Sequence, residues 1–202
     1  MRFLRGLRRA FDAGLAAVIL RERTLSDRAF GDLLGEVLAS ARSGDRWVGV
    51  HDRAHMVALG ARPGMGSGIG VAKGLHLGFR SLSPAAARTV VGPAVALGLS
   101  THAQDDPKDW RGADYLFHGP VNSTPSKIGW EEPVGIDGFE CALERAQAVN
   151  AGPLWAIGGL HPSDASELRA CGASGMVVLR GILGAPDPGA ATDEYQSAWG
   201  NP

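Results

Sequence analysis

Two short apolar runs near the C-terminus each contain glycine turns that can do chemistry. The first is WAIGGL at 155–160, and the second is GMVVLRGI at 175–182. Each run is typical of a buried strand that opens into a loop. In a (β/α)8 barrel, the loops after strands seven and eight form a phosphate site, because glycines let backbone N–H groups approach an anion closely. The runs therefore predict a phosphate near Gly158, Gly159 and Gly181.

Cationic and hydroxyl side chains that suit an anion follow other strand-like runs. Guanidinium and ammonium groups form strong charge-assisted hydrogen bonds with phosphate oxygens. The glycines and hydroxyls around Lys127 and Arg180 favour binding, whereas Arg23 is equally well read as an exposed charge at a helix entrance. The anion-binding candidates are Arg21, Arg23, Thr124, Ser126, Lys127 and Arg180.

Histidines also gather where strands are expected to end. Imidazole near pH 7 can donate or accept a proton, as acid–base chemistry on a phosphorylated substrate requires. Any one of these residues taken alone is more readily a packed or loop imidazole, so the cluster carries the prediction. Five of the six histidines belong to it, namely His51, His76, His102, His118 and His161.

Metal binding has little support in the sequence, and we expect no cofactor. Asp52 follows a strand-like run, but no second carboxylate falls at a matching strand end. A single carboxylate holds Mg2+ only with help from substrate phosphates. The glycine-rich segment 60–70 has neither dinucleotide-binding spacing nor a lysine at Walker spacing, so it predicts a loop.

Length and composition indicate one domain over residues 1–202. Hydrophobic residues make up 45% of the chain and the net charge is −1, which gives no case for a nucleic-acid or membrane partner. No apolar stretch is long enough for a signal peptide or a membrane span. Cys141 and Cys171 are expected to be free thiols, so we predict a cytoplasmic protein.

Strand and helix patterns alternate along the chain. Strands are expected near residues 16, 47, 72, 95, 114, 154 and 176, with helices at about 4–13, 27–42, 53–59, 84 onward, 137–149 and 163–171, and one weak helix near 194. Repeated strand–helix units predict an α/β fold with a parallel sheet, of the TIM barrel type. Because the pattern begins with a helix, the usual first strand would lie before residue 1: either the chain is truncated there, its start is misassigned, or the barrel is open on one side. The resulting open edge would need a cover, such as the partner in a homodimer.

The ordered motifs resemble those of the thiamine phosphate synthase/TenI superfamily. They are LRER at 20–23, HDR at 51–53, LHLG at 75–78, GPVNSTPSK at 119–127, AIGG at 156–159 and the run that starts at Gly175. The resemblance covers about residues 10–185 and implies a TIM barrel. The superfamily contains two main kinds of enzyme. One is a Mg2+-dependent synthase, which joins a pyrimidine diphosphate to a thiazole phosphate, and the other is a tautomerase, which aromatises the thiazole phosphate.

Departures from the synthase pattern favour the TenI-like branch. The synthase pattern has a glutamine where this chain has Ile19 and an asparagine where it has His51. It has an aspartate at the position of Ser81 and a small hydroxyl residue at the position of Arg180. Asp52 matches one family metal ligand. The thiazole-phosphate side is largely kept, with Ser100, Thr124, Ser126, Gly158 and Gly159.

The resemblance thus implies a thiazole tautomerase that uses His118 or His51 as acid or base. The tautomerase type has a histidine where this chain has Pro120, and His118 lies two residues earlier on the same strand face. A synthase with a degenerate pyrimidine and metal site, and a non-catalytic binding or regulatory protein, remain as alternatives.

Overall fold

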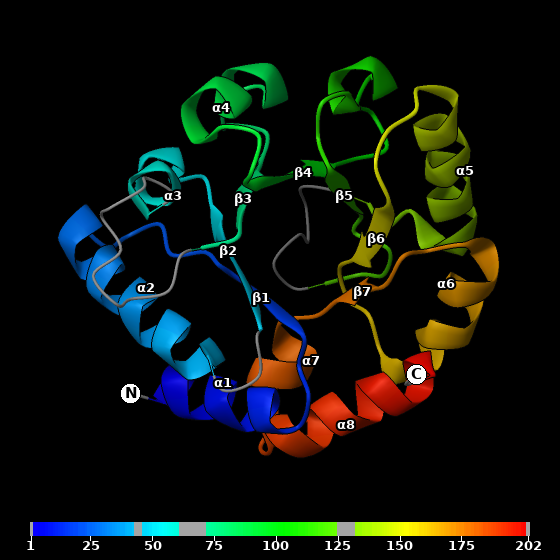
Figure 1. Ribbon diagram of the computed structural model, residues 1–202. Helices are drawn as coiled ribbons and strands as arrows, with labels where there is room; N and C mark the ends of the chain where they lie inside the picture. Colours follow the sequence, from blue (N-terminus) through cyan, green and yellow to red (C-terminus); the bar gives the residue numbers. More distant parts are fainter. Residues whose placement is uncertain (1, 43–45, 61–71, 125–131, 201–202) are drawn as a thin grey trace.

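The computed structural model describes residues 2–42, 46–60, 72–124 and 132–200, and shows one parallel sheet of seven strands. The strands pair in chain order, and the sheet curls into a half-barrel with helices outside it (Figure 1). The strands are β1 (Ala17–Leu20), β2 (Trp47–His51), β3 (Gly74–Leu77), β4 (Ala96–Thr101), β5 (Tyr115–His118), β6 (Leu154–Ile157) and β7 (Met176–Val177).

The predicted α/β fold with one strand missing from a TIM-type barrel is therefore confirmed. All seven strands lie where the sequence places them, although β7 is shorter than the predicted run 175–179. Within the described residues, β1 and β7 are the end strands and do not pair with each other. The homodimer that would cover this opening stays a prediction.

The seven predicted helices occur in the predicted order, and the two predicted N-caps, Ser26 and Ser83, are confirmed; the short helix at 180–183 was not predicted. The helices are α1 (Arg2–Asp12), α2 (Asp27–Ala41), α3 (Ala54–Gly60), α4 (Pro84–Val91), α5 (Gly135–Ala148), α6 (Ala165–Cys171), α7 (Arg180–Leu183) and α8 (Pro188–Trp199), with short 3-10 helices η2 (Pro107–Trp110) and η3 (Pro162–Asp164). Ser26 caps α2 and Ser83 caps α4, each by accepting a backbone N–H three residues on at 3.3 Å. A serine oxygen there satisfies a donor that has no partner in the helix.

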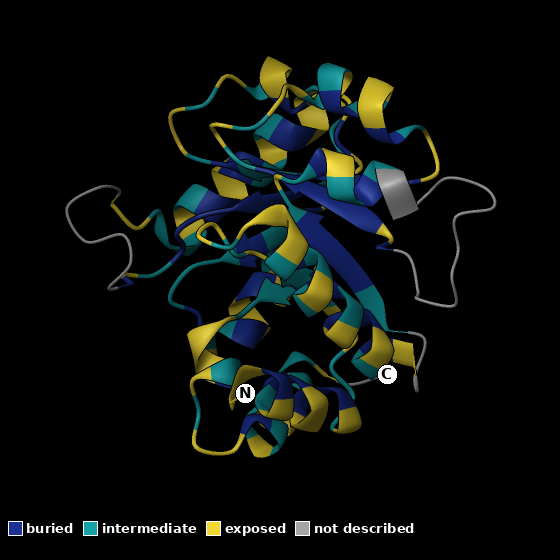
Figure 2. Ribbon diagram, turned by 90° about the vertical axis from the view of Figure 1, so that its left-hand side faces the viewer, coloured by how far each residue is buried: buried dark blue, intermediate teal, exposed yellow. Residues whose placement is uncertain are grey.

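The outer face of the sheet packs against the helices. Alternate strand residues point to opposite faces, and one set, including Val50, Leu75 and Leu97, is fully buried together with Phe30 and Val37 of α2. Figure 2 shows the buried strands in dark blue between helices whose outer surfaces are exposed. No helix among the described residues is long and apolar enough to cross a membrane.

The inner face combines glycines with large rings. The Trp47 ring lies over Gly49 and also over Gly74 on the neighbouring strand. In the same way Tyr115 covers Gly98, and Trp155 covers Gly175 just before β7. A Cβ atom at any of these glycines would collide with the ring above it. The missing side chains therefore make the room that the aromatic rings fill.

The last helix is longer than the sequence predicts. The sequence predicts one weak helix near Glu194, whereas α8 spans twelve residues. It is capped by Asp187 and tied to the N-terminal part of the chain by Gln196, whose amide donates to the Gly14 carbonyl at 2.7 Å. Cys141 and Cys171 are free, as predicted.

Candidate functional site

The carboxyl ends of the parallel strands bring most of the predicted site residues to one edge of the half-barrel. This edge is where (β/α) barrels carry their active sites. Ser126, Lys127 and the glycine-rich segment from residue 61 to 70 lie outside the described residues. The other predicted residues at this edge are Arg21, Arg23, His51, Asp52, Ser100, Thr124, Gly158, Gly159, Arg180 and Gly181.

The glycine turn after β6 meets the loop after β5. Gly158 and Gly159 have φ angles of 100° and 63°, which lie in the left-handed region that glycine adopts without strain. The Asn122 side chain donates to the Gly159 carbonyl at 3.3 Å and to Asp164 at 2.8 Å. Sequence analysis missed Asn122 and Asp164, since neither residue type nor spacing marks a bond across 42 residues.

The same loop brings two predicted anion-binding residues together. The Arg180 guanidinium donates a hydrogen bond to the hydroxyl of Thr124, whose residue is buried. Arg180 is the first residue of α7, so it belongs to a helical turn and not to the end of a longer strand. The predicted second glycine turn is not found, because Gly181 is the second residue of α7 and lies against Tyr195. A guanidinium beside a hydroxyl and the Gly158–Gly159 turn makes a coherent set of groups for one phosphate.

His51 and His76 lie on the inner face of the sheet, near the carboxyl edge. Their ring centroids are 5.9 Å apart, and His76 Nε2 is 2.9 Å from the Ser100 hydroxyl. Burial lowers the pKa of His51, and the nearby Arg21 charge lowers it further. Burial likewise lowers the pKa of His76 to about 3. Both imidazoles are therefore neutral at pH 7, the state in which one ring nitrogen can accept a proton.

His118 lies on the opposite face from His51. It is buried, its Nδ1 is 2.9 Å from the Thr101 hydroxyl, and its ring packs near Phe139 of α5 and Trp110 of η2. The structure thus does not bring His118 together with His51 or with the glycine turns. It places this imidazole between the sheet and the helix layer.

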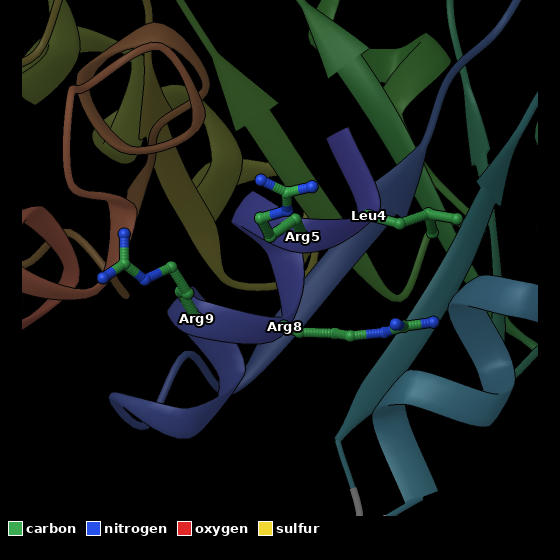
Figure 3. Close-up of a pocket in the computed structure, with 4 residues that line it drawn as sticks. All are labelled: Leu4, Arg5, Arg8 and Arg9. Atoms are coloured by element: carbon green, nitrogen blue, oxygen red, sulfur yellow. The ribbon is translucent and has the colours of Figure 1, made fainter. Parts of the chain in front are cut away.

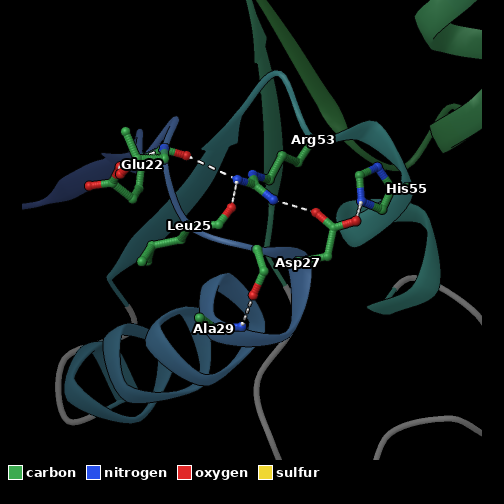
Figure 4. A network of polar contacts seen from close by, with 8 residues as sticks. Glu22, Leu25, Asp27, Ala29, Arg53 and His55 are labelled. Atoms are coloured by element: carbon green, nitrogen blue, oxygen red, sulfur yellow. Dashed lines mark hydrogen bonds and ion pairs between the residues drawn. The ribbon is translucent and has the colours of Figure 1, made fainter.

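An arginine that sequence analysis did not single out as a site residue shapes the loop after β1. Arg53 donates to the carbonyls of Glu22 and Leu25, and it pairs with Asp27 at the start of α2 (Figure 4). Its guanidinium also lies 4.5 Å from the centre of the Phe30 ring. These contacts fix the segment that carries Arg21 and Arg23. The sequence does offer one sign of a role for Arg53, since it directly follows Asp52 at the end of a strand.

Among the predicted site residues, only Asp52 offers a carboxylate to Mg2+. Asp52 is exposed, has a φ of 65° and donates its backbone N–H to the His76 carbonyl at 3.0 Å. The Ser81 hydroxyl already accepts from the backbone N–H of Gly78 at 2.8 Å. Among the described residues no group of three metal-ligating side chains occurs. Asp52 together with substrate phosphates fits Mg2+, which is commonly held in that way.

A hollow of about 300 Å3 on α1 contains none of the predicted site residues. It is lined by Leu4, Arg5, Arg8 and Arg9 (Figure 3). Arg8 pairs with Glu36 at 3.4 Å and Arg9 with Asp187 at 3.5 Å, and all four of these side chains are about half exposed. Exposed pairs of this kind contribute little energy. We assign no ligand to this hollow.

Acid should destabilise the fold through its buried histidines. Burial lowers the pKa of His118 to about 4, with His102 and Arg145 lowering it further and Asp105 opposing them. An unfolded imidazole has a pKa of about 6.5, so between about pH 6.5 and 4 the unfolded chain binds the proton first. We expect the free energy of unfolding to fall there by up to about 1.4 kcal/mol per pH unit for each of His118 and His76.

Urea unfolding at about pH 7, 6 and 5 measures this dependence. His118→Asn should make the loss of stability with falling pH shallower, because one imidazole no longer takes up a proton on unfolding. A pH dependence identical in the variant and the wild type would contradict the assignment to His118.

The fold and this edge together define a class of protein, a (β/α) half-barrel of TIM type with a candidate anion site at the carboxyl ends of its strands. The chain belongs to the thiamine monophosphate synthase family, whose sequence description matches residues 1–182. The superfamily named in the sequence analysis is thereby confirmed.

Individual relatives support the same family. The chain is 34% identical over 201 residues to the thiamine biosynthesis bifunctional protein ThiM/ThiE of Symbiobacterium thermophilum, a match that covers 96% of this chain and 39% of that protein. It is 32% identical over 187 residues to the thiamine-phosphate synthase of Moorella thermoacetica, covering 92% and 82%. The chain thus spans well under half of the first relative and most of the second.

Solved structures share the fold. The thiamine phosphate pyrophosphorylase of Pyrococcus furiosus superposes with a TM-score of 0.76 at 24% identity, covering 97% of this chain and 88% of that one. Orotidine 5'-phosphate decarboxylase of Pyrococcus horikoshii superposes with a TM-score of 0.64 at 13% identity, covering 98% and 94%.

The names of the relatives favour synthase over tautomerase. The cited sequence relatives are named as a thiamine-phosphate synthase and as a bifunctional thiamine biosynthesis protein. Nothing in these comparisons points to the TenI-like branch or to an isomerase. The synthase alternative of the sequence analysis is therefore better supported than its main interpretation.

Proposed function

We propose that this protein binds a thiazole phosphate at the carboxyl edge of the half-barrel, as part of thiamine biosynthesis. One observation carries the proposal: the Gly158–Gly159 turn lies against the loop after β5, and Arg180 of α7 contacts Thr124 of that same loop. Backbone N–H groups of the turn, the Thr124 hydroxyl and the Arg180 charge would surround the phosphate. Family membership supports the choice of thiazole phosphate as the anion.

The relatives favour coupling as the reaction, as in a thiamine-phosphate synthase. In that reading, Arg21 and Arg23 would bind the diphosphate of a pyrimidine partner, since two guanidiniums after β1 can stabilise the charge that develops on a diphosphate leaving group. Asp52 would hold Mg2+ with the substrate phosphates, and the ion would neutralise part of the same charge. Arg53 would keep both arginines in place through its bonds to Glu22 and Leu25.

Proton transfer on the thiazole phosphate is the second candidate, and the chain's own residues favour it. Ser81 stands where the synthase pattern has an aspartate, and its hydroxyl is taken by a bond to Gly78. His51 is neutral and lies beside His76 on the inner face, so it can act as a general base at pH 7. His118, which faces the helix layer, is not part of this proposal.

One set of assays separates the two reactions. The protein is given thiazole phosphate and the pyrimidine diphosphate with and without Mg2+, and thiamine phosphate is measured. In parallel it is given the dihydrothiazole tautomer, and the absorbance of the aromatic product is followed. Mg2+-dependent thiamine phosphate supports coupling, whereas aromatisation above the buffer rate supports proton transfer. Binding without either product supports the non-catalytic alternative.

Calorimetry tests the phosphate site itself, whatever the reaction. Arg180→Ser removes one charged donor, which should weaken thiazole phosphate binding by roughly 10- to 100-fold, the equivalent of about 1.5–3 kcal/mol. Arg111→Ser, at an exposed arginine beyond η2, is the matched control and should bind as the wild type does. Equal affinity in all three proteins would refute the site.

A further inference from the structure

Two buried polar atoms meet above Gly98 on the inner face of the sheet. Within the described residues, Nδ1 of His76 and the hydroxyl of Tyr115 have no hydrogen-bond partner. A Cβ atom placed on Gly98 would lie 2.5 Å from His76 Nδ1 and even closer to the Tyr115 ring carbon that carries the hydroxyl. The two groups therefore approach each other over the same glycine, with ring centroids 5.6 Å apart.

The chemistry of the two atoms fits a single arrangement. Leaving a buried donor or acceptor without a partner costs about 1–3 kcal/mol. A tyrosine hydroxyl is a donor, and a neutral imidazole has one nitrogen that donates and one that accepts. Burial and the Asp114 charge raise the pKa of Tyr115, so the hydroxyl keeps its proton.

We infer that Tyr115 is a positioning residue: a small shift of its ring from the position in the structure, favoured because both atoms are buried without a partner, lets its hydroxyl donate to His76 Nδ1 and so fixes which nitrogen of His76 carries the proton. With Nδ1 as the acceptor, Nε2 must carry the hydrogen. Nε2 lies 2.9 Å from the Ser100 hydroxyl and then donates to the Ser100 oxygen. The Ser100 O–H is left free to donate to a bound ligand.

The arrangement has a consequence for ligand choice. In the opposite tautomer, Nε2 would accept the Ser100 proton and Ser100 would offer only lone pairs to the ligand. With the Tyr115 donor in place, Ser100 presents a hydrogen, which suits a phosphate oxygen or another anionic acceptor. This step rests on the proposed function, since it assigns the Ser100 donor to the thiazole phosphate.

The state of His76 can be read directly by nitrogen NMR of the imidazole. We expect Nδ1 to show the shift of an unprotonated acceptor nitrogen and Nε2 that of a protonated one. Tyr115→Phe removes the donor with little change of shape and should lose this preference. Phe117→Leu is the control, because Phe117 packs 4.3 Å from the His76 ring centre without offering a polar group. A protonated Nδ1 in the wild type would overturn the inference.

Binding of thiazole phosphate tests the link to Ser100. Tyr115→Phe should weaken binding about 2- to 10-fold, as expected for one ordinary hydrogen bond. In a Ser100→Ala background the same change should have no further effect, because Tyr115 acts only through His76 and Ser100. Equal losses in both backgrounds would overturn the inference. No binding by the wild type would count against the proposed function, while the nitrogen shifts would still decide the role of Tyr115.

Discussion

Gly159→Ala should abolish binding of the thiazole phosphate and lower the free energy of unfolding by about 3 kcal/mol or more. Gly159 has a φ of 63°, and a Cβ atom there would lie 2.5 Å from the Ser123 carbonyl oxygen and 2.8 Å from that of Asn122. Both neighbours are backbone atoms, so they cannot rotate away as a side chain does. The turn and the loop after β5 would have to separate, and the proposed phosphate groups would separate with them.

Gly172→Ala is the matched control for this prediction. Gly172 closes α6 with a φ of 101°, but nothing lies within 4 Å of a Cβ atom added there. It should cost only the backbone strain of alanine in the left-handed region, about 1–2 kcal/mol, and leave binding unchanged. Urea unfolding and calorimetry on the two variants measure both effects. Similar losses in both would show that strain, and not the collision, dominates.

His51→Ala should slow proton transfer on the thiazole phosphate by about 100-fold or more, the usual contribution of a positioned general base. His51 is on the inner face beside Arg21 and His76, and it is neutral at pH 7. His118→Ala should leave kcat unchanged, because that ring is enclosed by Trp110, Phe139 and Thr101. Its loss should instead lower stability by about 2–3 kcal/mol through a cavity and an unpaired threonine.

Steady-state kinetics at a temperature where both variants are folded decides between the two histidines. A large fall in kcat for His118→Ala, with no fall for His51→Ala, would reverse the assignment. For the coupling reaction the same pair of variants is informative, since of the two only His51 lies on the inner face, where the two substrates would meet.

The strands could be predicted from the sequence because each is a short apolar run that ends in glycine or a polar residue. The direction in which His118 points could not. Strands of a parallel sheet are apolar on both faces, so Phe117 and His118 look alike as candidates for the inside. The contacts in the structure show the difference: Phe117 packs against His76 on the inner face, whereas His118 packs against Trp110 and Phe139 on the helix side.

Contacts between distant loops account for most of what the sequence left open at the site. The bond between Arg180 and Thr124 joins residues 56 positions apart, and it depends on α7 starting at Arg180. That four-residue helix is too short to leave a periodic pattern. The extent of α8 was also missed, because its Pro, Gly and Ala content suggests a weak helix while packing against α1 and α7 supports it.

The glycine and aromatic residues of the inner face impose a rule on how this chain can change. Gly175 can acquire a side chain only if Trp155 becomes smaller, and Gly98 can do so only if both Tyr115 and His76 make room. Each single replacement is harmful while the paired replacement restores the volume, so the two effects do not add. Among functional variants of this chain, we therefore expect a glycine and the ring that covers it to be substituted together or to stay unchanged together. Trp47, which covers glycines on two strands, has two partners to satisfy and should be the slowest of the three to vary.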